Sequence, residues 1–340
     1  METKGLKSSS LFNRALLAIL SVRESGIILA VIVLTVVFTS MNAVFITFGF
    51  MMVILSFAAR VGVIAAGMTL LMGSREFDLS VGSVFALAPI IAYTLADLNV
   101  NIWIGVVLGM VVCALCGLFN YYVAVRLRIS SLITTLGTMF FFRTIDLVLT
   151  AGGARIPPLE EKAFLWIFGN GLIYGVPTAV FWWLAITFVC VLLLGKTKHG
   201  NWTLAVGGNV DAAKALGVNT DRVKMKNFVL TAVLAGLSGL IYCTRSGAVY
   251  AVYGAGMELT VVGAVAIGGT SLLGGSATVL GTAIASILLG MVYLGLITVL
   301  PSTTQVPAMY FYEGGVGAII IGMSILNMTL DKVRAQRRIA

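Results

Sequence analysis

Long apolar runs, separated by short polar stretches, make up most of the chain from residue 26 onward. A bilayer core about 30 Å thick is crossed by about 20 apolar residues in a helix. The second run is too long for one upright helix, so we expect it to be tilted or kinked, with a start at the membrane surface. The pattern predicts an all-α polytopic membrane protein with about ten transmembrane helices, at 26–42, 46–73, 79–96, 102–125, 132–150, 178–195, 227–245, 257–272, 277–298 and 311–328.

The amino-acid composition is typical of an integral membrane protein. Of the 340 residues 59% are apolar and 10% are charged, and the mean hydropathy is +1.06. A soluble domain carries about 25% charged residues. The net charge of +9 is spread over the ends of the predicted helices, so we do not expect a nucleic-acid partner. We interpret residues 1–340 as one transmembrane domain in contact with membrane lipid.

Most basic residues lie in the loops on one side of the predicted helices. In membrane proteins the cytoplasmic loops carry an excess of Lys and Arg, so this side is predicted to be cytoplasmic. The opposite loops hold only Arg155, Lys162 and Arg245. We therefore expect both termini in the cytosol, with cytosolic segments at 1–25, 196–226 and 329–340, and no cleaved signal peptide. The residues behind this orientation are Lys4, Lys7, Arg14, Arg23, Arg126, Arg128, Lys196, Lys198, Lys214, Arg222, Lys224, Lys226, Lys332, Arg334, Arg337 and Arg338.

The sequence offers little chemistry of its own. Cys113 and Cys116 form a CxxC motif, but neighbouring metal ligands are missing and both cysteines fit helix packing better. A GKT at 195–197 matches part of a phosphate-binding loop, yet position 190 is Cys where that loop needs glycine. We expect no enzyme activity, metal or cofactor in this chain.

The cytosolic segment 196–226 predicts one short helix. Asn209 is a good N-cap, Asp211 falls in the first turn, and Gly217 is placed to end the helix in a left-handed conformation. The helix between them is small-sided and too short to be stable alone in water. It must pack either on the ends of this protein's own helices or on a partner.

Two charges and an amide fall inside predicted membrane helices. Arg143 and Asp146 are spaced i, i+3, so we expect them to pair and to face the interior or water. The two residues either line a translocation path or form a purely structural pair. Asn120 likewise either lines the path or has a structural role.

Two polar motifs lie near the ends of predicted helices. Asp78, Ser80 and Ser83 either face a substrate at a helix break or cap a helix at the cytosolic interface. Thr270 and Ser271 lie within GGTSLLGG, whose glycines would let helices approach closely while the two hydroxyls bond across them. We keep all five residues as candidates for the translocation path.

Three stretches in this order resemble one family. They are DLSVGSVFAL at 78–87, GNWTLAVGGNVDAAKALGVNTDRVKMKNFVLTAVLAGLSGL at 200–240 and AVAIGGTSLLGGSATVLGT at 264–282. They are similar to ribose-type ABC importer permeases, a family that includes xylose, arabinose, galactoside and autoinducer-2 permeases. The resemblance covers roughly residues 44–325 and says little about the substrate. The residues Arg75, Glu76 and Phe77 depart from the usual pattern of this family and place a possible ion pair beside Asp78.

The resemblance implies a type II importer in a bacterial or archaeal inner membrane. Two permease copies would surround a path for a monosaccharide or similar polar metabolite. A solute-binding protein would sit outside, and an ATPase pair holding ATP-Mg would sit in the cytosol. The short cytosolic helix would enter a groove on the ATPase, which assigns a coupling role to Gly207, Gly208, Asn209, Ala212, Ala213 and Gly217.

Other functions also fit the sequence. An ion-gradient-driven transporter would use Arg143, Asp146 and Asp78 for coupling. A membrane-embedded enzyme would need a polar catalytic cluster, which we did not find in the sequence. A same-family importer of nucleosides or of a furanose signal is a closer variant.

Overall fold

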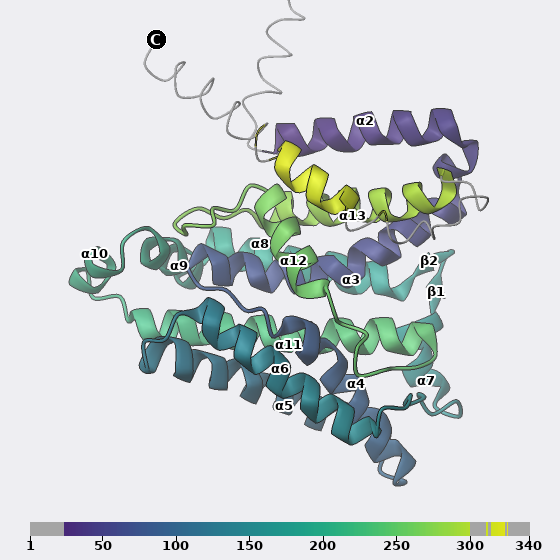
Figure 1. The fold of residues 1–340 in the computed structure, drawn as a ribbon, viewed down its shortest axis with the longest axis horizontal. Helices are drawn as coiled ribbons and strands as arrows, with labels where there is room; N and C mark the ends of the chain where they lie inside the picture. The colour runs from purple at the N-terminus through teal and green to yellow at the C-terminus, as the bar shows by residue number, and fades with distance from the viewer. Residues whose placement is uncertain (1–23, 300–310, 312–313, 324, 326–340) are drawn as a thin grey trace, which may run out of the picture.

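The computed structural model describes residues 24–299, 311, 314–323 and 325, and these form a bundle of helices (Figure 1). Most of the predicted cytosolic N-terminal segment, the cytosolic tail and part of the tenth span lie outside the described residues.

The described residues confirm an all-α polytopic membrane protein. Six helices are long and apolar enough to cross a membrane: α3 (Phe48–Gly73), α5 (Ile102–Tyr121) continued by the π-helical turn η2 (Tyr122–Arg126), α6 (Ser131–Thr150), α8 (Thr178–Lys196), α11 (Thr220–Ser246) and α13 (Val279–Val299). Four shorter apolar helices fall where the remaining spans were predicted: α2 (Ser25–Met41), α4 (Val81–Asp97), α12 (Met257–Ile267) and Gly314–Met323.

Two spans differ from simple membrane helices. The second begins with the 3₁₀ turn η1 (Ala43–Ile46) before α3, which fits the predicted kinked start. Helix α12 has 11 residues and ends at Ile267, so the prediction of a span over 257–272 was wrong. It rises only about 16 Å. Its end is set by glycines, because Gly269 has φ 93° and residues 268–278 form a loop.

The two ends of the bundle carry different small elements (Figure 1). One end holds α7 (Lys162–Leu165), the π-helical turn η3 (Trp166–Asn170) and a two-stranded antiparallel hairpin, β1 (Leu172–Ile173) with β2 (Val176–Pro177), in which Leu172 faces Pro177. The other end holds α9 (Lys198–Gly208) and α10 (Val210–Ala215). The sequence reading did not predict α9, and it placed the start of α11 seven residues too late.

Helix α11 is the central helix of the bundle. Its most apolar 18-residue window is 72% buried, against 33% to 50% for the other five long helices. It packs against α3, α4 and α5. Small residues make this possible: a Cβ on Gly239 would overlap the Phe85 carbonyl oxygen, and one on Gly236 would overlap Cys113. Cys113 and Cys116 are both buried in helix packing, as predicted.

We predict that Gly239→Val strongly lowers the yield and thermal stability of the detergent-extracted protein. The added side chain would collide with backbone, and overpacking a tight interface typically costs about 1–3 kcal/mol or more. Gly137→Val on α6 is the matched control, because nothing lies within 4 Å of a Cβ at that glycine. Size-exclusion chromatography with a melting curve would measure both variants, and equal behaviour would contradict the tight contact.

Candidate functional site

Three segments meet backbone to backbone at the end of the bundle that carries α10. The Gly275 amide donates to the Gly73 carbonyl oxygen at 3.1 Å. A Cβ on Gly207 would overlap that same carbonyl, and one on Gly274 would lie 2.8 Å from the Arg75 Cβ. We call Gly73, Gly207, Gly274 and Gly275 the glycine junction. It joins the end of α3, the end of α9 and the 268–278 loop, so two of the family motifs contact each other here.

A buried amide ties α11 to the same place. Asn227 is fully buried, and its Nδ2 donates to the Leu70 carbonyl oxygen at 3.2 Å, to Ser74 Oγ at 3.1 Å and to Thr203 Oγ1 at 3.3 Å. Its Oδ1 lies 2.8 Å from His199 Nε2. Since buried hydrogen bonds of an amide are costly to lose, Asn227 fixes α11 against α3 and α9.

The residues that depart from the family pattern add an ion pair at this end. Glu76 Oε1 pairs with Lys224 Nζ of α11, and both side chains are largely buried, at 12% and 15% exposure. The ion pair expected beside Asp78 is therefore formed between Glu76 and a distant helix, not with Arg75. It is a second tie between α11 and the segment after α3.

Helix α10 forms as the sequence predicts. Asn209 Oδ1 accepts a hydrogen bond from the Ala212 amide at 2.9 Å, Asp211 lies in the first turn, and Gly217 has φ 80°. One face of α10 packs on this chain: Ala213 is buried in a small cluster with Val206 and Val223. The other face is open.

The open face ends in a residue that the sequence reading missed. Leu216, directly before Gly217, is 83% exposed. The sequence did carry a signal for this residue. Leu216 is the one large apolar side chain at the end of a short helix in a charged segment, where water would otherwise surround it. Of the predicted coupling residues, Gly208, Asn209, Ala212 and Gly217 are exposed, whereas Gly207 and Ala213 serve as anchors inside the chain.

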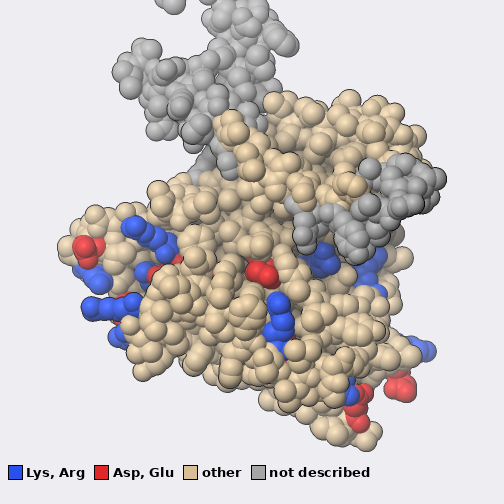
Figure 2. Space-filling model, in the orientation of Figure 1, with Lys and Arg blue, Asp and Glu red and all other residues tan. Residues whose placement is uncertain are grey.

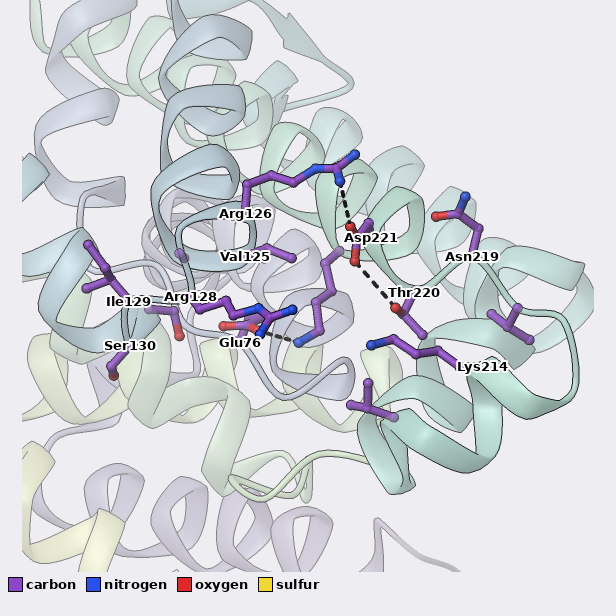
Figure 3. Close-up of a pocket in the computed structure, with 15 residues that line it drawn as sticks. Glu76, Val125, Arg126, Arg128, Ile129, Ser130, Lys214, Asn219, Thr220 and Asp221 are labelled. Carbon is purple, nitrogen blue, oxygen red and sulfur yellow. Dashed lines mark hydrogen bonds and ion pairs between the residues drawn. The ribbon is translucent and has the colours of Figure 1, made fainter.

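A charged cavity of about 640 Å³ lies beside α10 (Figure 3). It opens between the α10–α11 turn and the loop from η2 to α6, and Arg126 Nη1 pairs with Asp221 Oδ2 at 3.2 Å across it. Exposed pairs of this kind contribute little stability. Figure 2 shows charged side chains gathered at this end of the molecule. The charged residues that line the cavity are Glu76, Arg126, Arg128, Lys214, Asp221 and Lys224.

The candidates at the start of α4 form one buried network. Asp78 Oδ1 accepts from the Ser80 amide at 2.9 Å and from Ser80 Oγ at 2.6 Å. Asn120 Nδ2 donates to both Asp78 oxygens at 3.2 Å and to Ser80 Oγ at 2.8 Å. Burial raises the pKa of Asp78, and the hydrogen bonds from Ser80 and Asn120 oppose that rise. Ser83 Oγ donates to the Met139 carbonyl at 2.7 Å.

This network is closed to solvent, because Asp78, Ser80, Ser83 and Asn120 are all fully buried. The two hydrogen bonds from Ser80 to Asp78 shape the turn before α4. Ser80, the N-cap residue of α4, makes no side-chain cap hydrogen bond, so the expected helix cap is not formed. The sequence reading did not foresee that Asn120 belongs to the same network, since 42 residues separate it from Asp78.

Arg143 and Asp146 do not form the predicted ion pair, so this prediction was wrong. Neither of the two Asp146 oxygens, nor Nε or Nη2 of Arg143, has a hydrogen-bond partner among the residues that the structure describes. The i, i+3 spacing puts both residues on one side of α6 but does not fix their rotamers. Asp146 is buried, so its predicted interior position is confirmed.

Thr270 and Ser271 do not bond across helices. Thr270 Oγ1 accepts from the Thr278 amide at 3.2 Å, and Ser271 Oγ accepts from the Leu273 amide at 3.2 Å. Both contacts lie within the 268–278 loop. The prediction failed because this stretch is a glycine-stabilised loop and not the end of a helix. Close packing was correct, since a Cβ on Gly281 would overlap the Gly268 carbonyl.

A polytopic helical bundle with a short exposed helix at one end has the form of a membrane-embedded transport subunit. Residues 50–324 match the family described as "Branched-chain amino acid transport system / permease component", and the chain belongs to that family. The resemblance drawn from the three motifs is confirmed by this match and by relatives that align along most of the chain.

Three relatives illustrate the family. The ribose import permease protein RbsC of Escherichia coli strain K12 is 31% identical over 306 residues, which are 89% of this chain and 92% of the relative. The L-arabinose transport system permease protein AraH of the same strain is 35% identical over 214 residues, 63% of this chain and 64% of AraH. The autoinducer 2 import system permease protein LsrC of Klebsiella pneumoniae is 29% identical over 322 residues, 93% and 89% of the two chains.

We predict that Gly207→Ala lowers the melting temperature of the purified protein, whereas Gly208→Ala leaves it unchanged within error. At Gly207 the new methyl group would collide with the Gly73 carbonyl and the Gly275 amide, but at Gly208 the nearest atom is 3.9 Å away. A collision of this kind costs about 1–3 kcal/mol. Two neighbouring glycines in one helix make a matched pair, and a smaller loss at Gly207 than at Gly208 would contradict the glycine junction.

Proposed function

We propose that this chain is the membrane-spanning subunit of an ATP-driven importer. With a second permease copy it forms the path for a monosaccharide or a similar small polar metabolite. Recognition at high affinity rests with a solute-binding protein outside, and ATP-Mg binds to a partner ATPase in the cytosol. The observation that carries the proposal is the alignment of 89% of the chain with a ribose import permease, together with its relatives named for arabinose and autoinducer 2.

The open face of α10 supports an ATPase docking site at this end of the bundle. Leu216 supplies an exposed apolar contact beside the charged cavity, and an apolar anchor surrounded by polar residues is the usual composition of a protein interface. The buried face of α10, through Ala213, holds the helix on the bundle. We therefore place α9, α10 and the cavity in the cytosol, as the basic residues of the segment indicate.

The connection from α10 to the bundle supports a mechanical role. Only four residues separate the end of α10 from Thr220, where α11 begins, and α11 then runs 27 residues through the centre of the bundle, a length of about 40 Å. A displacement of α10 by the ATPase is passed directly to the most buried helix. The bundle then changes the side to which its path is open.

The opposite end offers a surface for the solute-binding protein. Its hairpin turn projects Tyr174, which is 99% exposed, and Leu159 in the same outer segment is 71% exposed. We infer that these two side chains contact the solute-binding protein. An ion pair between Arg155 and Asp97 at 3.4 Å, and a backbone bridge from Arg155 to Val249, hold this segment on the helix ends.

Reconstituted transport tests the proposal. The tagged chain is purified from its native membrane, and the ATPase and binding protein that accompany it are identified. The complex is then assayed in liposomes for uptake of ribose, arabinose, xylose and leucine. We expect saturable uptake of a sugar that requires ATP and both partners. Uptake that persists without any ATPase and stops with a proton or sodium ionophore would establish the ion-driven alternative, and uptake of leucine alone would overturn the sugar assignment.

We predict that Leu216→Glu lowers ATP-dependent uptake by about tenfold or more, because interface anchors of this kind carry about 2 kcal/mol. The complex should lose its ATPase on size-exclusion chromatography while the permease keeps its melting temperature. Leu216→Met should behave as the wild type. Leu98→Glu, at an equally apolar and 68% exposed site before α5, is the matched control. Normal ATPase binding by Leu216→Glu would refute the docking site.

A further inference from the structure

One arginine lies in the middle of a membrane helix. Arg60 is the thirteenth of the 26 residues of α3, so nearly 20 Å of helix extends on each side. A charge at this depth is costly and normally pairs with another group or serves a function. Within the described residues the Arg60 side chain has no ion pair and donates no hydrogen bond, and its Nε is buried without a partner. The side chain as a whole is partly exposed, and none of its donors is used within the described residues.

Aromatic rings hold this guanidinium in place. Its Cζ lies 4.5 Å from the centroid of the Phe57 ring and 4.6 Å from that of Tyr242 on α11. Such cation–π contacts stabilise the charge without using its N–H groups. Ser238 Oγ of α11 also donates to the Arg60 carbonyl oxygen at 2.6 Å. The position of Arg60 between α3 and α11 is thus fixed before any ligand arrives.

The two rings belong to a continuous row of aromatic side chains. Phe57 stacks on Tyr293 with centroids 4.7 Å apart. In the other direction Tyr242 contacts Tyr253 at 6.1 Å, and Tyr253 contacts Tyr250 at 5.1 Å. Each member of the row keeps part of its surface exposed. We call this row the aromatic track, and its members are Tyr250, Tyr253, Tyr242, Arg60, Phe57 and Tyr293.

The outer part of the aromatic track lies on a segment that re-enters the bundle. Residues 247–256 between α11 and α12 are not helical, and they carry Tyr250 and Tyr253. The segment reaches the start of α4, where a Cβ on Gly254 would overlap the Gly82 carbonyl. Helix α12 begins only about 16 Å from the junction end of the molecule. Irregular backbone at such depth is found where it is buried in protein or lines a water-filled cavity, and broken helices mark binding sites in transporters.

We propose that the aromatic track is the contact surface for a neutral sugar during its passage through the permease. This inference rests on the proposed function and names the residues that would meet the substrate. The edge N–H groups of Arg60 donate to sugar hydroxyls, and the ring of Tyr242 packs on the apolar C–H face of the sugar. Phe57, between Arg60 and Tyr293, holds the guanidinium in place. The tyrosines at 250 and 253 guide it from the outer side.

The chemistry of the aromatic track suits a polyhydroxylated ring better than an apolar solute. A guanidinium presents several donors in one plane, so it can bond to two neighbouring hydroxyls. Aromatic walls with a few convergent polar groups are the usual composition of a small-molecule site. The track is partly exposed and holds a single cation among the described residues, so binding should be weak, as passage requires.

Substitutions at Arg60 and Tyr242 test the inference in the reconstituted complex. Arg60→Met keeps an unbranched apolar stem and removes the charge and every donor. Tyr242→Leu removes the ring, and Tyr242→Phe removes only the hydroxyl group. Lys196→Met is the control, because it removes an exposed cation at the end of α8, away from the aromatic track. Initial uptake rates of ribose, arabinose and xylose are measured beside basal ATP hydrolysis and the melting temperature.

We expect Arg60→Met to lower the maximal uptake of the transported sugar by about tenfold or more, which corresponds to the loss of charge-assisted hydrogen bonds. Basal ATP hydrolysis and the affinity of the binding protein should stay as in the wild type. Arg60→Met and Tyr242→Leu should also change the ratio of uptake rates among the three sugars. Tyr242→Phe should cause a smaller change, and Lys196→Met none.

Two results would overturn the inference while leaving the proposed function intact. The first is wild-type uptake and selectivity in Arg60→Met. The second is an equal loss for all sugars with a lowered melting temperature, which would make Arg60 purely structural. If the wild-type complex itself takes up no sugar, the proposed function fails instead, so the two failures are distinguishable.

Discussion

Close contact between helix backbones is the constraint on which the rest of this structure depends. Lipid chains are as apolar as the helix surfaces, so helices in a membrane associate through tight packing and through hydrogen bonds between them. Helix α11 comes close enough to α3, α4 and α5 because glycines lie at the crossing points, as at Gly239 against Phe85. Its polar ties to α3, through Asn227 and Ser238, are possible only at that separation.

Features set by neighbouring residues could be predicted from the sequence. The number and order of the apolar helices follow from the length of the apolar runs. The limits of α10 follow from Asn209 and Gly217, because an N-cap side chain and a left-handed glycine act within one turn of the helix that they bound. The motif order identified the family, because it combines three independent stretches.

Features set by contacts between distant residues could not be predicted. The run from 257 to 272 is mostly apolar, and its hydropathy does not show that Gly269 takes a positive φ and that the helix ends early. The side of α10 that packs on the chain depends on Val206 and Val223 from other helices. The environment of Arg60 depends on Tyr242, which lies 182 residues away in sequence. The candidate path residues were chosen for polarity alone, and most proved to be satisfied within the chain.

The three ties between α3 and α11 have a mechanical consequence. The amide of Asn227 and the hydroxyl of Ser238 join α11 to α3, and the ion pair of Glu76 with Lys224 joins α11 to the segment directly after α3, so the two helices resist sliding past each other. Helices α3 and α11 therefore act as one rigid unit about 40 Å long. A tilt of about 10° around the midpoint of this unit displaces each of its ends by roughly 3.5 Å. The ends travel in opposite directions. One rocking motion of the two helices would therefore widen the molecule on one face of the membrane and narrow it on the other.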